Sequence, residues 1–391
     1  FPTRRSSDLT FAQAVGTLGT DYSYLLGSKY SYFNIQEVYG NNSVTLESIN
    51  ELGVLANMLC YAQWNASDKV GLTPAFEFND GHTVALTNCG HGIWLSTFNN
   101  LTFSYSIPLI GILGSGTDKF LPIGNFYSLR LELTMDNFLN FTAPMTANKL
   151  TGCTITEVEF CGQVVELDST PQSMIEQANP DKIYIRSQSY RTATNYLAGG
   201  SSGLQDILIG TRVSSLKSMY ITCSPADAAE KKFASVCPNL GQGSCLVLAG
   251  MNLPQRTLNP VNHPADTFIE LQKALGALSA TVYNGCTNRA AYYTASSAIG
   301  TLVGVMNGYN TTTTPTAVSS TPSTFIIGVN TEIVAHRGGL LSGININGAP
   351  SFLRCQITTA LTAYTHTLYM FAYHDVILEI DPVAKTVISK F

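Results

Sequence analysis

The stretch from Phe103 to Leu133 constrains the fold more than any other part of the chain. Its two ends alternate apolar and polar residues, as strands do when one face is buried and the other meets water. Between them, Pro108 lacks a backbone donor and ends the hydrogen-bonded ladder, and the glycines at 111, 114 and 116 permit a sharp reversal. Such a corner forms where a strand leaves one sheet and the next enters the facing sheet. The stretch therefore predicts an all-β sandwich.

Composition limits the size and class of the protein. A chain of 391 residues forms one large or two medium domains, and 45% hydrophobic residues can fill their cores. Charged residues are only 12%, about half the usual share. A polar, weakly charged surface is typical of β-rich proteins that pack against copies of themselves or work outside cells. The net charge is −5 and the basic residues are scattered, so no nucleic-acid-binding patch is expected.

The sequence does not predict a membrane span, a cysteine-based framework or zinc site, or glycosylation. The longest apolar candidate for a membrane span, Ala298 to Met306, is too short and contains two glycines. The nine cysteines are odd in number and include no C-x-x-C pair, which argues against a disulfide framework and against a zinc site. In a chain this rich in Asn, Ser and Thr, chance explains the glycosylation sequons better than modification does. The sequons lie at Asn41, Asn65, Asn100, Asn140 and Asn310.

The first residues are excluded from the fold prediction. Residues 1–8, Phe-Pro-Thr-Arg-Arg-Ser-Ser-Asp, resemble a translated sequencing adapter and are set aside. The reading frame is then expected to be cut at this end, so that the native N-terminus is missing.

Strand patterns dominate the chain, and only two helices are expected. Each helix follows a capping box, Ser48-Ile-Asn-Glu51 in one case and Thr267-Phe-Ile-Glu270 in the other. The expected strands are 30–38, 83–87, 102–107, 128–135, 154–160, 182–190, 218–222, 325–329, 352–358, 365–373, 376–380 and 386–389.

One helix in each β-rich half predicts two similar modules in tandem. The first would span 9–170, incomplete at its N-terminus, and the second 182–391, with a polar linker at 171–181. The longest irregular stretch, 286–324, is rich in Thr, Ser and Pro. A loop of that length is usually functional or flexible, and it is expected on the outer surface.

Two motifs match catalytic or phosphate-binding patterns only formally. Gly199 to Gly203 fits the nucleophile elbow G-x-S-x-G around Ser201, but no strand–helix alternation surrounds it, so a flexible loop is the better interpretation. The segment from Gly111 to Lys119 lacks the lysine directly after its last glycine that a phosphate-binding loop needs.

The histidines also have structural interpretations. His82, Cys89 and His91 lie close in sequence, but a fourth metal ligand is missing and their spacing is irregular, so buried cysteine and turn histidines are expected. His366 and His374, near Asp375, lie in strongly strand-like sequence. His366 shares a strand face with Leu368 and Met370 and is expected to be packed rather than catalytic. No catalytic, cofactor-binding or metal-binding residue is therefore assigned, and no enzyme is expected.

Several segments, in order, resemble one viral family. Ser106-Ile-Pro-Leu109, Gly111-Ile-Leu-Gly114, Lys119-Phe-Leu-Pro122 and Leu129–Leu133 are similar to a segment of the double jelly-roll major capsid proteins of polinton-like and adintovirus-like DNA viruses. Further segments with this resemblance are Asp181–Tyr190, Arg212–Lys217, Phe268–Leu275, Phe325–Gly328, Leu341–Asn345 and Tyr373–Leu378.

The resemblance implies two jelly rolls standing side by side, with three copies forming a pseudo-hexagonal capsomer of an icosahedral shell. It implies a virion protein, assembled inside the host cell, whose partners are its own copies and minor capsid or penton proteins. It implies no cofactor. The alternative is an extracellular β-sandwich binding protein, such as a lectin or adhesin. A lectin usually shows an acidic calcium-binding cluster, and the absence of a D-x-D/N cluster favours the capsid.

Overall fold

The computed structural model describes residues 7–13, 23–25, 29–41, 43–63, 93–95, 101–105, 107–114, 120–125, 127–144, 150–156, 158–162, 165–226, 229, 232–233, 235, 243–260, 262–276, 325–332, 342–348, 350–357 and 365–391. The expected strand at 83–87, the apolar run at 298–306 and the long loop at 286–324 lie outside these residues. No helix within the described part is long and apolar enough to cross a membrane.

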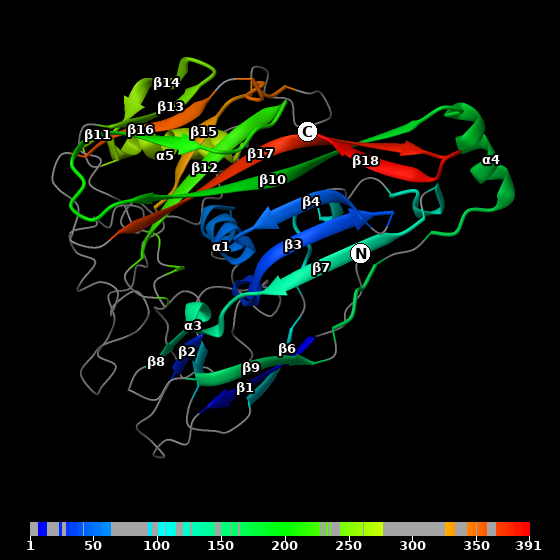
Figure 1. The fold of residues 1–391 in the computed structure, drawn as a ribbon, viewed down its shortest axis with the longest axis horizontal. Helices are drawn as coiled ribbons and strands as arrows, with labels where there is room; N and C mark the ends of the chain where they lie inside the picture. Colours follow the sequence, from blue (N-terminus) through cyan, green and yellow to red (C-terminus); the bar gives the residue numbers. More distant parts are fainter. Residues whose placement is uncertain are drawn as a thin grey trace.

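Antiparallel sheets make up each half of the chain (Figure 1). In the first half the strand orders are β6-β1-β9, β5-β2-β8 and β4-β3-β7. The strands are β1 (Ser7–Gln13), β2 (Ser23–Leu25), β3 (Phe33–Gly40), β4 (Val44–Asn50), β5 (Ile93–Leu95), β6 (Leu101–Tyr105), β7 (Leu129–Met135), β8 (Thr142–Pro144) and β9 (Leu150–Thr156).

The second half contains two larger sheets. One has the order β10-β17-β12-β15, with β18 also paired to β17, and the other has the order β11-β16-β13-β14. The strands are β10 (Ile183–Leu197), β11 (Gly203–Ile209), β12 (Leu216–Pro225), β13 (Ser244–Leu248), β14 (Met251–Leu258), β15 (Ile327–Asn330), β16 (Ser351–Ile357), β17 (His366–Asp381) and β18 (Thr386–Lys390). Every described strand pairs only within its own half.

The corner predicted from Phe103 to Leu133 is present. β6 and β7 belong to different sheets, and a 3₁₀ turn, Gly111–Leu113, lies on the path between them. Along β7 the leucines at 129, 131 and 133 are half-buried, while Arg130 and Glu132 are exposed. This alternation is the one read from the sequence.

The longest strands run further than predicted. β10 and β17 pair without a register shift from Ile183 opposite Ile380 to Leu197 opposite His366. The expected strands at 365–373 and 376–380 are therefore one strand. At the other extreme, the strand expected at 154–160 is β9, which ends at Thr156, and Val158 and Phe160 beyond it are exposed.

Both helices are present, but the predicted capping boxes were wrong. Helix α1 (Leu52–Gln63) begins after Ser48, which lies in β4 and donates a hydrogen bond to Glu37. Helix α5 (Pro264–Ala274) begins before Thr267, because a proline at its first turn starts it earlier. Thr267 is then a buried residue inside the helix.

The junction between the halves, where a polar linker is expected at 171–181, contains a helix. Residues Ser169–Ala178 form helix α4 (Figure 1), and the described side chains of this helix are exposed. A further short helix, α3, spans Phe138–Phe141. At the start of α4, the Asp168 carboxylate accepts the Ser169 N–H at 2.7 Å, and the Asp168 carbonyl accepts the Gln172 N–H.

The two halves share their buried interior. The larger cluster joins α1 residues such as Leu52 and Leu55 to Met219 of β12 and Phe371 of β17. A second, smaller cluster joins both halves again and contains Val38, Leu46, Ile112, Val376, Leu378, Ile380 and Val387. The strands of each half therefore pair separately, but the two halves pack against each other through a common hydrophobic core.

Candidate functional site at the seam between the halves

Glu47 is a buried carboxyl at the point where the corner, the first half and the second half meet. Its Oε1 accepts the Ile112 N–H at 2.9 Å and the hydroxyl of Ser189, which lies on β10. Its Oε2 accepts a bond from Gln36 on β3 at 3.3 Å. Burial raises the pKa of Glu47 to about 7, although these hydrogen bonds act in the opposite direction.

Gly111 allows the corner to approach this carboxyl. It has a φ of +79°, and a Cβ there would lie 2.1 Å from Glu47 Oε1. Only glycine adopts that conformation freely and leaves room for the carboxylate. Gly111 was predicted from the sequence to allow a turn. The structure shows that glycine is also needed there to leave space for Glu47, more than sixty positions earlier in the chain.

A second polar cluster lies inside the second half. Lys217 on β12 is 3% exposed, and its Nζ lies 3.1 Å from Asp375 Oδ1 and 3.4 Å from Glu332 Oε1. Ser215 Oγ donates to Asp375 Oδ2 at 2.7 Å, and Ser342 Oγ donates to Glu332 at 2.9 Å. A lysine buried to this degree needs opposite charges beside it, which the two carboxylates supply.

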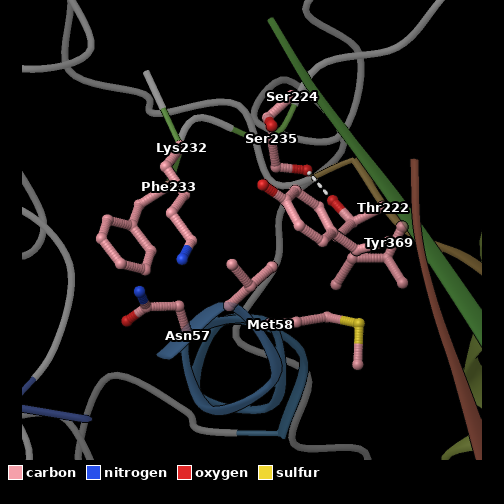
Figure 2. Close-up of a pocket in the computed structure, with 10 residues that line it drawn as sticks. Asn57, Met58, Thr222, Ser224, Lys232, Phe233, Ser235 and Tyr369 are labelled. Carbon is pink, nitrogen blue, oxygen red and sulfur yellow. Dashed lines mark hydrogen bonds between the residues drawn. The ribbon is translucent and has the colours of Figure 1, made fainter. Parts of the chain in front are cut away.

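A third group of charges links the halves beside α1. Lys232 Nζ lies 2.6 Å from Asp136 Oδ2 and 2.8 Å from Glu51 Oε2, and it donates to Asn34 at 3.3 Å. A pocket adjoins it, and Figure 2 shows the Lys232 side chain extending toward α1 and Asn57. Its lining comes from both halves: Val54, Asn57, Met58, Thr222, Ser224, Lys232, Phe233, Ser235, Ile326 and Tyr369.

Two hydroxyl side chains in the lining of the pocket, Thr222 on β12 and Ser235, lie next to each other. The hydroxyls of Thr222 and Ser235 lie 2.8 Å apart, as drawn in Figure 2, and both also lie within hydrogen-bond distance of the Phe325 carbonyl. Because each hydroxyl has a single proton, each can donate to the other hydroxyl or to the carbonyl, but not to both. Because its ammonium already faces two carboxylates and an amide, Lys232 is an ion-pair residue. It joins the second half to Glu51, just before α1, and to Asp136, just after β7.

The formal nucleophile Ser201 lies in the connection from β10 to β11, and β11 begins at Gly203. Its N–H donates to the Ala198 carbonyl at 3.2 Å, and a strand rather than a helix follows. The structure therefore gives Ser201 the loop position that was expected, without the strand-to-helix turn of an elbow.

The two strand histidines are buried. His366 is 0% exposed, as expected for a packed residue. His374 is equally buried, and its ring packs edge-on against Phe391 at a centroid distance of 5.6 Å. Burial lowers the pKa of His374 to about 4, so it is neutral at physiological pH.

Among the residues that the structure describes, no three His, Cys, Asp or Glu side chains are grouped so that they could hold a metal ion. His82, Cys89 and His91 lie outside those residues.

Sequence reasoning missed the partners of Asp375 and the whole of the Glu47 site. Lys217, Glu332 and Asp375 lie on segments more than forty residues apart, and no local pattern connects them. The sequence held only indirect evidence of the Lys217 cluster. Three of the segments that resemble the capsid family, Arg212–Lys217, Leu341–Asn345 and Tyr373–Leu378, meet at this cluster in the structure.

No protein-family model matches the chain, and no curated protein matches it. Solved viral structures do resemble it. VP54 of PBCV-1, in a structure fitted into a reconstruction of the virophage Sputnik, has a TM-score of 0.53 at 10% identity, covering 100% of this chain and 98% of that chain. A chain of the Sputnik virophage structure has a TM-score of 0.52 at 13% identity, covering 99% and 81%.

The Faustovirus major capsid protein has a TM-score of 0.55 at 8% identity, covering 96% of this chain and 85% of that one. These likenesses confirm the predicted fold: the chain is a double jelly roll.

Proposed function

We propose that the chain is a capsid subunit of a DNA virus, built to pack against copies of itself in an icosahedral shell. One observation carries the proposal: the structural match to VP54 extends over 100% of this chain and 98% of that one. Coverage this complete supports the proposal, because it includes both halves of this chain and nearly all of the matched subunit. The Faustovirus major capsid protein supports the same assignment.

The finer proposal is a homotrimer with pseudo-hexagonal outline, which meets neighbouring capsomers and minor capsid or penton proteins. Three copies of two similar modules place six sandwiches around one axis. A trimer contact of this kind is heterologous and closes into a ring. The protein would then reside in the virion, after assembly inside the host cell, with the loop at 286–324 on the outer surface.

Exposed apolar side chains on two strands of the second half support self-association. Tyr184 and Tyr196 on β10 are 60% and 63% exposed, and Leu204 and Leu208 on β11 are 59% and 51% exposed. A contact between copies would remove these apolar surfaces from water, which favours association. The low charge of the chain, 12%, removes the self-repulsion that would oppose contacts between identical copies.

The test is the assembly state of the full chain across a wide concentration range. Light scattering is expected to report the mass of three chains, and electron microscopy is expected to show hexagonally outlined particles that tile into sheets or shells. Monomers alone at high concentration would contradict the proposal. Binding of those monomers to a glycan array would favour the lectin alternative instead.

A further inference from the structure

Lys217 occupies an irregular position between two paired strands. Leu216 of β12 lies opposite His374 of β17, whereas Ser218 lies opposite Tyr373, so Lys217 is the extra residue at a shift of register. A bulge of this kind redirects a side chain away from the regular alternation. The Lys217 ammonium consequently lies inside the module, 3% exposed, beside Asp375 of the neighbouring strand.

Asp375 is held in one orientation. The Ser215 hydroxyl donates to its Oδ2 at 2.7 Å and itself accepts the Gly343 N–H at 3.1 Å, which fixes the direction of the hydroxyl proton. The backbone N–H of Asp375 also donates to the Ser215 carbonyl at 3.2 Å. The other carboxylate oxygen, Oδ1, therefore faces Lys217 Nζ at 3.1 Å.

Glu332 completes the arrangement as a base within reach of the same nitrogen. Its Oε1 lies 3.4 Å from Lys217 Nζ and accepts the Ser342 hydroxyl. The Glu332 side chain is 14% exposed, so it is largely shielded from water. A carboxylate beside an ammonium can take one of its protons and return it to a departing oxygen, once a small side-chain movement brings the pair to hydrogen-bond length.

We propose that Lys217 and Asp375 condense into an intramolecular isopeptide bond, with Glu332 as the proton relay. Lys217 gives one proton to Glu332, and the neutral amine attacks Asp375 Cγ. The C–Oδ1 bond then breaks, and two of the three ammonium protons leave on that oxygen as one water molecule. The third proton stays on the new amide nitrogen, Oδ2 becomes the amide oxygen held by Ser215, and Glu332 ends as a carboxylate.

The surroundings favour this step in two ways. Adjacent strands of one sheet hold the two groups in contact, which replaces a bimolecular encounter by an intramolecular one with a high effective concentration. The reaction also turns a buried ammonium and a buried carboxylate into a neutral amide. Of the three charges only that of Glu332 then remains, on a side chain that is 14% exposed and accepts the Ser342 hydroxyl. No oxidant, metal or cofactor is needed.

The bond would join β12 to β17 covalently at the irregular point of their ladder. β17 is the strand that pairs with β10, β12 and β18, so it lies at the centre of its sheet. A covalent tie there would stop the sheet from opening between its central strands under mechanical load.

Intact-mass spectrometry of the denatured full chain tests the proposal. The chain is expected to be lighter by one water than the mass calculated from its sequence. A tryptic digest should contain a branched peptide in which residues 213–231 are joined to residues 355–385, with no cleavage after Lys217. A chain at its calculated mass, with normal cleavage after Lys217, would overturn the proposal.

Glu332→Gln is the matched variant, because it keeps the shape and the hydrogen bond from Ser342 but cannot relay protons. It is expected at its full calculated mass. Lys232 supplies an internal comparison, since it also faces Asp136 and Glu51 but is more exposed, at 12%, and has Asn34 as a third acceptor. A lost water that maps to Lys232, or one that persists in Glu332→Gln, would refute the assignment.

Discussion

The carboxyl group of Glu47 on β4 accepts a hydrogen bond from the hydroxyl of Ser189 on β10. The two residues are 142 positions apart, and they lie in different jelly rolls. No described strand pairs across the junction, so this bond, the ion pairs of Lys232 with Asp136 and Glu51, and the shared apolar clusters are among the contacts that hold the modules together. Glu47 is 1% exposed, so its protonation state bears directly on stability.

We expect stability to fall as pH rises through the titration of Glu47. Burial raises the pKa of this carboxyl from 4.5 to about 7 in the folded chain, so its favourable effect is complete below pH 4.5 and is lost as pH rises through about 7. The loss amounts to about 3 kcal/mol. Glu47→Gln should therefore be more stable than the wild type at pH 8.5 but not at pH 4.5, as measured by denaturant unfolding at both values. An equal difference at the two values would contradict this.

Gly111→Ala is expected to destabilise the protein by more than about 2 kcal/mol, because the new Cβ would lie 2.1 Å from Glu47 Oε1 in a left-handed backbone conformation. Gly200→Ala is the matched control. Gly200 has a φ of +77°, but a Cβ there meets nothing within 4 Å, so only the conformational cost of about 1 kcal/mol remains. Similar losses in the two variants, measured by thermal unfolding, would show that the contact with Glu47 is unimportant.

Leu378→Ala is expected to cost about 2–5 kcal/mol, the usual range for a cavity left by a buried leucine. Leu378 is 1% exposed and belongs to the cluster that also contains Val38 and Leu46 of the first half. Val383→Ala, at a position 83% exposed, should change the free energy of unfolding by less than about 0.5 kcal/mol. Equal effects in urea titrations of the two variants would argue against a core shared between the modules.

Leu208→Lys is expected to weaken self-association without unfolding the subunit. Leu208 is 51% exposed on β11, and a charge there would have to be desolvated in a contact between copies. Leu208→Met keeps the surface apolar and should assemble as the wild type does. Light scattering measures the oligomer, and circular dichroism checks the fold. Normal assembly of Leu208→Lys would exclude this part of β11 from the contact.

The sequence alone determined the class of fold. The alternation of Leu129, Leu131 and Leu133 with polar neighbours depends only on a period of two residues, which is a local property, and β7 follows it. The existence of the two principal helices was likewise visible from apolar spacing. Their first residues were not, because Ser48 finds its hydrogen-bond partner, Glu37, on the neighbouring strand.

Tertiary structure decided everything that depends on distant partners. The run Tyr373-His374-Asp375 looks like a break between two strands, yet β17 continues through it because β10 pairs with every residue from His366 to Ile380. Lys217 meets Asp375 only because a shift of register turns its side chain inward. The two-residue period of a strand determines which face each side chain lies on, and it can be seen in the local sequence. Register, bulges and the burial of charged groups depend instead on pairing between strands that are far apart in the chain.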